Sequence, residues 1–470
     1  MLCPLFFLWF ASGFVMMYWG FPEVGQDERL GKAEALTPSM IRVSPEAAYA
    51  LLQWPNPPDD AGLSMLGGRP IYQFRTRRLQ SIVYADTGDR LASVSQGMAL
   101  GVAARWTGQS ATEAHFDDFL RDADQWTVSG HFAALRPLFK FSWPNGEQVY
   151  VSASSGEVVQ HTKPHTRLAA YFGAIPHWSY WTLLKKNNNR WYKFVVWSSG
   201  IATSVSLLGL IVGCWMYSPS RRYRFRGHPT RIPYSGPKRW HMFLGLLFGS
   251  LACTWAFSGL LSMEPFDWLA GNDEYALKVA AAMRGAIRLD AFASKGPGVA
   301  LDQASLQTKE LEFVFFDGEP FYVARQSVKV ARIVPVRGNP SDQFDPARIL
   351  ELVRRTTTSV AEANIISRYD AYYLDRNGQH PLPALLVRLN DASRSQYYID
   401  LKTARIVEAY DSRLRWNRWL YHGLHSWNLP WLYSHRPAWD ILVIALLLGG
   451  TALTATALTL GIRVLGRLLK

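Results

Sequence analysis

Four long apolar stretches constrain what this chain can fold into more than any other feature. They cover about residues 2–19, 194–217, 242–263 and 439–462. An α-helix of about 20 residues crosses the roughly 30 Å of hydrocarbon in a bilayer. The sequence therefore predicts a polytopic membrane protein with four spanning helices.

The first stretch has two interpretations, a membrane anchor or a cleaved signal peptide. A signal peptide begins with basic residues and ends with small residues at its cleavage site. Residues 1–4 contain no Lys or Arg, and residues 16–19 are the bulky Met-Met-Tyr-Trp. We therefore expect an anchor.

The basic residues indicate the orientation of the spans. The formal net charge is +13, and the loop 218–240 contains seven Lys or Arg residues and no Asp or Glu. Short basic loops stay in the cytoplasm, as we expect also for Arg463, Arg467 and Lys470, whereas long segments are translocated regardless of charge. The outer domains, 21–192 and 264–438, are therefore expected in the periplasm of a bacterial inner membrane.

The position of the basic loop also bears on its partners. Because it lies beside spans, we expect contact with anionic lipid headgroups and no nucleic acid. Docking of a cytosolic flavin reductase or of an acidic donor there stays open.

Cysteine chemistry is largely excluded. Cys3, Cys214 and Cys253 all lie in apolar runs, where Cys behaves as a small hydrophobic residue. The sequence has no disulfide framework, no CxxCH haem attachment and no zinc spacing.

The chain contains an internal repeat. The first and third apolar stretches share Trp, Ser, Gly and Met at an offset of 246 residues: Trp9, Ser12, Gly13 and Met17 match Trp255, Ser258, Gly259 and Met263. Segment 148–159 aligns without gaps to 396–407, and the same offset of 248 places His177 on His425. We therefore expect a duplicated unit of span, outer domain and span, with the halves related by an axis along the membrane normal.

The outer domains have the patterns of small α+β units. Alternating apolar residues flank turn signals at 86–89, 144–146 and 155–156, which predicts three hairpins. Segments 112–125 and 346–357 have helical spacing. The predicted fold is thus a four-span helical bundle carrying two α+β outer domains.

Three local patterns resemble the PepSY-associated transmembrane family. They are Tyr-Val-Ser-Ala-Ser-Ser-Gly-Glu-Val-Val at 150–159, Lys-Arg-Trp-His-Met-Phe-Leu-Gly at 238–245 and Tyr-His-Gly-Leu-His at 421–425. Their order on a repeated four-span frame extends the resemblance over nearly the whole chain. Members of that family include inner-membrane reductases that release iron from ferric siderophores, and some resemble di-haem cytochromes b with histidine axial ligands. PepSY domains are also associated with peptidase inhibition.

His177 and His425 are the first candidate haem ligands. They lie just outside the second and fourth spans at equivalent repeat positions, so a pseudo-twofold axis can bring them face to face. Two neutral imidazoles suit a haem iron. The alternative is a pair of interfacial histidines beside aromatic anchors. His422, three residues before His425, is the competing ligand.

His241 is the candidate ligand for an inner haem at the cytoplasmic end of the third span. Its repeat partner falls before residue 1, so either the start codon is assigned too late or that ligand has been lost. We expect upstream codons for a basic residue, an aromatic and a His. His228 is expected to be solvated, and His435 to lie at the interface.

Small residues in the spans permit close helix packing or contact with a cofactor. They are Gly209, Gly213, Gly245, Gly249, Gly449 and Gly450. The Ser-Gly pairs at 12–13 and 258–259 are expected to be packing residues.

Two functions follow from these observations. The first is a membrane reductase that uses haem b to pass electrons from an unidentified donor to a periplasmic ferric siderophore or other ferric chelate. The second is a non-enzymatic module that binds a peptide, a peptidase or a receptor. The sequence contains no nucleotide-binding or hydrolase motif that indicates another chemistry.

The predicted orientation has a direct test. A single Cys introduced between residues 221 and 239 should react only with a membrane-permeant thiol reagent in intact cells, because short basic loops are retained in the cytoplasm. Labelling by an impermeant reagent from the periplasm would reverse the topology.

Overall fold

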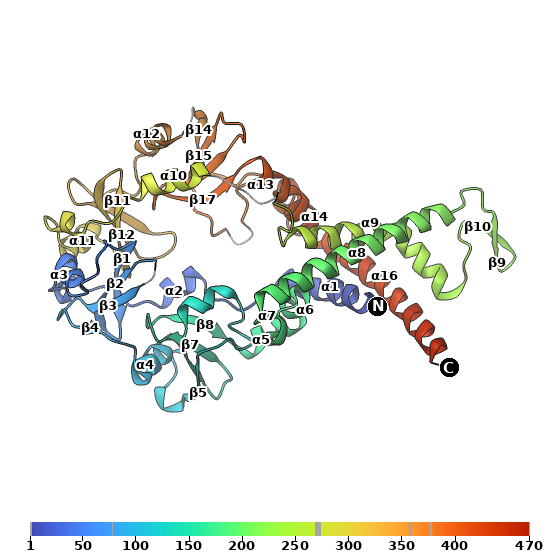
Figure 1. Cartoon of the computed structure of the whole chain (residues 1–470), viewed down its shortest axis with the longest axis horizontal. Helices are drawn as coiled ribbons and strands as arrows, with labels where there is room; N and C mark the ends of the chain where they lie inside the picture. The colour runs from blue at the N-terminus through green and yellow to red at the C-terminus, as the bar shows by residue number, and fades with distance from the viewer. Residues whose placement is uncertain (1, 78, 268–273, 358–359, 376–377, 470) are drawn as a thin grey trace.

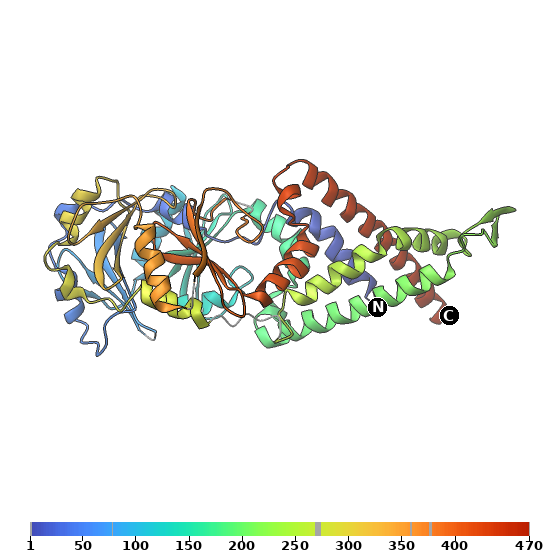
Figure 2. The same cartoon turned by 90° about the horizontal axis from the view of Figure 1, so that it is seen from above.

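The computed structural model describes residues 2–77, 79–267, 274–357, 360–375 and 378–469. The molecule is elongated, with a helical bundle at one end and a ring of β-sheets at the other (Figures 1 and 2). Lys470, predicted to be cytoplasmic, lies outside the described residues.

The bundle contains four helices, of which three are long and apolar enough to cross a membrane. These three are α8 (Asn188–Met216), α9 (Gly236–Leu261) and α16 (Ala438–Leu468). The fourth, α1 (Cys3–Met16), has 14 residues, about 21 Å at 1.5 Å per residue. Spanning length is therefore found for three of the four predicted stretches, and a spanning role for 2–19 stays a prediction.

The two halves of the chain interleave in the bundle. Helix α1 of the first half packs against α16 of the second, and α8 of the first packs against α9 of the second. Glycines make this possible: a Cβ on Gly450 would lie 2.0 Å from the Phe10 ring, and one on Gly449 would lie 2.2 Å from the Phe248 ring. Gly449 and Gly450 therefore serve close helix packing, which was one of the two roles considered for the small residues, the other being contact with a cofactor.

Strands from both halves form one antiparallel sheet of seven strands in the order β13-β12-β11-β1-β2-β3-β4. The first half supplies β1 (Asp60–Leu66), β2 (Arg69–Arg75), β3 (Gln80–Tyr84) and β4 (Arg90–Leu91), and the second supplies β11 (Glu310–Phe316), β12 (Glu319–Arg325) and β13 (Ala331–Pro335). The central pair joins Gly62 to Glu312 and Leu63 to Leu311. A pseudo-twofold axis therefore passes between β1 and β11.

Each half adds a four-stranded antiparallel sheet in sequence order. The first contains β5 (His115–Leu120), β6 (Leu138–Ser142), β7 (Gln148–Ser152) and β8 (Val158–Thr162), and the second contains β14 (Val360–Ile366), β15 (Ala384–Leu389), β16 (Gln396–Asp400) and β17 (Arg405–Tyr410). The matching strand orders agree with the sequence repeat. The seven-stranded sheet shared by 21–192 and 264–438 is a feature that the repeat alone does not predict.

Helices pack on these sheets. The first half has α2 (Gln26–Lys32), η1 (Pro38–Met40), α3 (Pro45–Ala50), α4 (Gln96–Thr107), η2 (Ala111–Glu113) and η3 (Gly130–Leu135), and the second has α10 (Glu274–Met283), η4 (Leu289–Phe292), α11 (Pro297–Ala304) and α12 (Pro346–Thr356). Helices α3 and α11 cover one face of the seven-stranded sheet in a single core. Helix α4 begins where Ser95 accepts a hydrogen bond from the Met98 amide, and α12 begins at Asp345 in the same way.

Short helices connect the sheets to the bundle. Before α8 come α5 (Pro164–Phe172), α6 (Ala174–Trp178) and α7 (Thr182–Lys185); before α16 come α13 (Ser412–Asn417), the π-helix η5 (Arg418–Gly423), α14 (Leu424–Ser426) and α15 (Pro430–Tyr433). A hairpin of β9 (Tyr223–Phe225) and β10 (His228–Thr230) joins α8 to α9. It occupies the basic loop 218–240.

The three predicted hairpins are confirmed by the β3–β4, β6–β7 and β7–β8 pairs, and helix 346–357 is confirmed by α12. The prediction of a helix over 112–125 is wrong, because this segment contains β5. A β-bulge between Phe116 and Asp118 lets Phe116 and Phe119 pack on Phe141 and Phe139 of the neighbouring strand. The bulge therefore gives a strand the three-residue apolar spacing of a helix.

The glycine packing in α16 predicts a position-specific loss of stability. Gly450→Ala should destabilise the bundle by about 1–3 kcal/mol, because the added methyl group displaces the Phe10 ring. Gly461→Ala in the same helix should cost nothing, since no atom lies within 4 Å of the added Cβ and Ala favours helix formation. Thermal unfolding in detergent measures both. Equal midpoints for the two variants would contradict this packing.

Candidate functional site

The structure brings His177 and His425 together where the ring of sheets joins the bundle. His177 lies on α6 and His425 on α14, and their ring centres are 5.9 Å apart. Both helices lie at this junction in Figure 1. The repeat predicts this juxtaposition from the sequence, whereas ligation by the pair stays a prediction.

Each imidazole is held by a Ser from a bundle helix. His177 Nδ1 lies 3.0 Å from Ser12 Oγ and 3.2 Å from the Trp9 carbonyl oxygen. His425 Nδ1 lies 3.0 Å from Ser258 Oγ, which itself donates to the Trp255 carbonyl. The two contacts are repeat copies of each other. Ser12 and Ser258 were expected to be packing residues rather than ligands, and in the structure they also hydrogen-bond to the histidines.

These contacts determine which ring nitrogen carries the proton. Ser12 and Ser258 donate their own protons to the Trp9 and Trp255 carbonyls, so each Oγ accepts from Nδ1 and the lone pair of each imidazole lies on Nε2. Burial lowers the pKa of His177 to about 4 and, together with the nearby His177, lowers that of His425 to about 3. Both rings are therefore neutral near pH 7, which is the form that binds a metal.

A cavity of about 580 Å³ surrounds the pair. Its lining repeats across the pseudo-twofold axis. The repeat-related pairs are Trp9 and Trp255, Gly13 and Gly259, Met17 and Met263, Trp191 and Trp439, and Val195 and Val443. The indole Nε1 of Trp191 donates to the Trp178 carbonyl, and that of Trp439 donates to the Ser426 carbonyl. The cavity is therefore apolar, aromatic and built equally from both halves.

The residues present fit a haem better than a bare metal ion. Among the described residues, no three His, Cys, Asp or Glu side chains form a metal-binding group, whereas a haem iron needs only axial protein ligands. His177 and His425 would hold the haem iron, and the cavity volume is typical of a cofactor pocket.

The other candidate histidines lie elsewhere. His422 packs against the Tyr421 ring at 4.4 Å and does not line the cavity. His435 and His228 are exposed. His241 lies on α9, with Nδ1 3.0 Å from Thr456 Oγ1 on α16.

His241 repeats the hydrogen-bond pattern of the pair. Thr456 Oγ1 donates to the Leu453 carbonyl three residues earlier, and the His241 ring is bonded to the same carbonyl. Ser12 and Ser258 likewise donate to carbonyls three residues earlier. Because Thr456 Oγ1 uses its own proton on the Leu453 carbonyl, Nδ1 of His241 is the donor and the lone pair lies on Nε2.

A second, polar cavity of about 310 Å³ lies on the seven-stranded sheet at the pseudo-twofold axis. Glu312 in this cavity binds Arg284, Arg325 and Arg405. Burial raises the pKa of Glu312, but the three guanidinium groups outweigh burial and the net shift is downward. Residues of both halves line this cavity.

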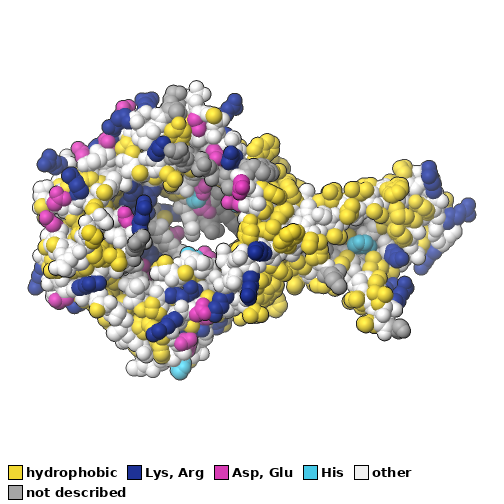
Figure 3. All heavy atoms as spheres, in the orientation of Figure 1, with side chains coloured by type: hydrophobic (Ala, Val, Ile, Leu, Met, Phe, Trp, Pro, Cys, Tyr) yellow, Lys and Arg dark blue, Asp and Glu magenta, His cyan; other side chains and the backbone are white. Residues whose placement is uncertain are grey.

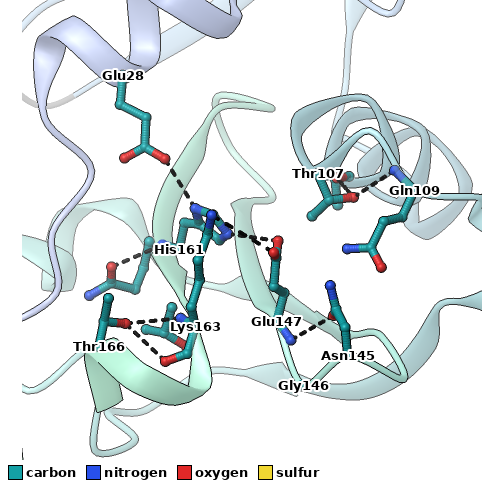
Figure 4. A network of polar contacts seen from close by, with 12 residues as sticks. Glu28, Thr107, Gln109, Asn145, Gly146, Glu147, His161, Lys163 and Thr166 are labelled. Carbon is teal, nitrogen blue, oxygen red and sulfur yellow. Dashed lines mark hydrogen bonds and ion pairs between the residues drawn. The ribbon is translucent and has the colours of Figure 1, made fainter. Parts of the chain in front are cut away.

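A third polar cluster is centred on His161 of β8 (Figure 4). Nδ1 of His161 lies 3.0 Å from Glu28 of α2, and Nε2 lies 3.2 Å from Glu147. Each ring nitrogen of His161 is thus within hydrogen-bond distance of a carboxyl oxygen. The cluster ties α2 to the edge of the β7–β8 hairpin, which is a structural role.

Comparisons with models of known protein families and with curated proteins give no match. The resemblance to the PepSY-associated family therefore stands on the motifs in the sequence alone.

Sequence reasoning found the two histidines but missed what holds them. Ser12 and Ser258 match each other in the repeat, which could have marked them as part of the site. Only the structure shows that they contact the imidazole rings. Trp191 and Trp439 match at the offset of the histidines and were also missed as part of the site.

The His161 cluster predicts that replacing His161 destabilises the protein, whereas replacing the nearby His165 does not. His161→Ala should lower the free energy of unfolding by about 1–3 kcal/mol, because two carboxylates lose a hydrogen-bond partner. Thermal unfolding of the purified protein measures this loss. His165→Ala is the matched control, since His165 lies four residues later and is exposed. A similar midpoint for both variants would remove the stabilising role.

Proposed function

We propose that this chain is a haem-containing membrane reductase that passes electrons through the bundle to a ferric complex on the side of the outer domains. One observation supports the proposal: His177 and His425, one from each half, line one cavity with their ring centres 5.9 Å apart. Because hydrocarbon about 30 Å thick separates the two sides of a membrane, an electron needs a buried redox centre to cross it.

The residues have separate roles in this proposal. His177 and His425 would hold the haem iron, and Ser12 and Ser258 would fix their tautomers and orientation. The aromatic residues around them exclude water and keep the site in a low dielectric. When bound, haem supplies the one-electron chemistry that these side chains lack. His241 would serve a second haem nearer the other end of the bundle.

The substrate would be a ferric siderophore or another ferric chelate. Reduction alone suffices to release the iron, because hard oxygen ligands bind ferric iron more tightly than ferrous iron. The short helices α6 and α14 carry the histidines to the edge of the ring, whose opening is visible in Figure 3. With the basic loop in the cytoplasm, this opening would face the periplasm of a bacterial inner membrane, and the activity would assist iron uptake.

Replacing either axial histidine should remove haem and activity together. His177→Ala or His425→Ala should lose one haem equivalent and at least about 90% of ferric-chelate reduction, because a bis-imidazole site needs both ligands. Pyridine haemochrome absorbance and ferrous-iron release measure the two effects. Added imidazole should restore part of the haem in either variant, and exposed His435→Ala should behave as wild type.

The Ser residues give a milder test. Ser12→Ala or Ser258→Ala keeps the carbonyl contact to Nδ1, so haem should remain bound. The midpoint potential should rise by about 20–60 mV, since the ligand loses an acceptor worth about 0.5–1.5 kcal/mol and becomes less basic. Full haem in His177→Ala, or a colourless wild-type protein that captures a peptidase, would overturn the reductase and favour the non-enzymatic module.

A further inference from the structure

The end of the bundle opposite the sheets carries basic side chains and no acidic ones. No Asp or Glu occurs between residues 158 and 263, nor after Asp440. The basic hairpin, residues 218–239, exposes Arg221, Arg222, Arg224, Arg226, Arg231 and Lys238. Dark blue side chains mark this tip in Figure 3. The patch is therefore a concentrated positive surface.

The basic hairpin is a folded element. Its strands pair from Tyr223 with Thr230 to Phe225 with His228. Arg239 donates to Thr230 Oγ1 at 3.0 Å, and its guanidinium lies 4.7 Å from the centre of the Phe225 ring. The Tyr223 hydroxyl donates to the Met216 carbonyl at the end of α8. A polybasic lipid-binding segment needs no such order, whereas recognition of a folded protein benefits from it.

At the tip of the hairpin, Arg226 adopts a left-handed backbone conformation that disfavours most residues other than glycine. Arg226 has φ of +49° and Gly227 has φ of +84°, as a two-residue hairpin turn of this type requires. Asn or Gly suits the first of these positions better than Arg. The exposed guanidinium of Arg226 is thus held at the end of the hairpin at a cost in backbone energy.

The basic hairpin also stands away from the level of the lipid headgroups. Trp215 at the end of α8 and Trp240 at the start of α9 are 84% and 61% exposed, and exposed Trp residues at helix ends mark the membrane interface. Strands β9 and β10 extend beyond those helix ends in both views (Figures 1 and 2). This placement favours a partner from the aqueous phase over lipid.

We propose that the basic hairpin is the docking surface for a folded, acidic, soluble electron-carrier protein. The inference rests on the proposed reductase function, since it names the side from which electrons enter. His241 lies two residues beyond Arg239 in the chain, so a carrier bound to the hairpin is next to the redox ligand at this end of the bundle. Transient electron-transfer complexes use small, charge-complementary surfaces of this kind.

The test uses full-length protein in nanodiscs of zwitterionic lipid and an acidic flavodoxin, reduced beforehand, as the probe. Stopped-flow absorbance records haem reduction at low and high salt. The wild-type rate should fall about tenfold or more as salt rises, because exposed charges are screened. R224Q/R226Q should be about tenfold slower than wild type at low salt and lose most of the salt dependence.

The matched control is R463Q/R467Q, which removes two exposed charges from the end of α16 and should change the rate less than about twofold. Reduction of both variants by dithionite should equal that of wild type, which shows that the haem sites are intact. Equal flavodoxin rates for R224Q/R226Q and wild type would overturn the proposal. The proposal would also be overturned if R224Q/R226Q changed only the amount of anionic lipid that the protein retains and left the flavodoxin rate unchanged.

Direct binding of the oxidised flavodoxin to the nanodiscs separates this inference from the reductase itself. If the wild-type protein contains no haem, the proposed function fails. Binding that is weakened by R224Q/R226Q but not by R463Q/R467Q would then still support the docking surface. Binding that is insensitive to the hairpin charges would overturn the docking surface whatever the haem content.

Discussion

The antiparallel pairing of β1 with β11 is the contact on which the arrangement of the molecule depends. It joins the two copies of the repeat at the far end of the ring, through Gly62 with Glu312 and Leu63 with Leu311. At the other end, α1 packs on α16 and α8 on α9. Because the halves are tied at both ends, α6 and α14 are brought to the same place, and a histidine from each meets the other there.

The repeat is imperfect beside the paired histidines. Tyr421 and His422 of the π-helix η5 correspond to Gly173 and Ala174 of the first half at the offset of the histidines. A Cβ on Gly173 would lie 2.9 Å from Val15, so glycine there permits the close approach to α1. π-Helical turns are rare and concentrate at functional sites. Tyr421 therefore lines the cavity from the second half, whereas the first half has only a glycine at the matching position.

Local signals carried most of what the sequence could predict. Turn residues located the hairpins, apolar length located α8, α9 and α16, and the repeat offset paired His177 with His425. The shared sheet could not be predicted, because β1 and β11 are about 250 residues apart in the chain. The strand at Phe116 was misread because its bulge gives helical spacing. The hydrogen bond between His177 and Ser12 could not be predicted either, because it joins residues 165 positions apart that only the packing of the bundle brings together.

One small arrangement recurs at three histidines on separate helices. A Ser or Thr inside a bundle helix donates to the carbonyl three residues earlier, and the Nδ1 of a histidine from another segment binds at that point, as at Ser12, Ser258 and Thr456. An isolated buried imidazole is costly unless its N–H is satisfied. Satisfying Nδ1 each time leaves the lone pair on Nε2, the atom that would bind a metal. The same hydrogen-bond arrangement therefore relates His241 to the outer pair, and under the proposed function both ends of the bundle would hold haem in the same way.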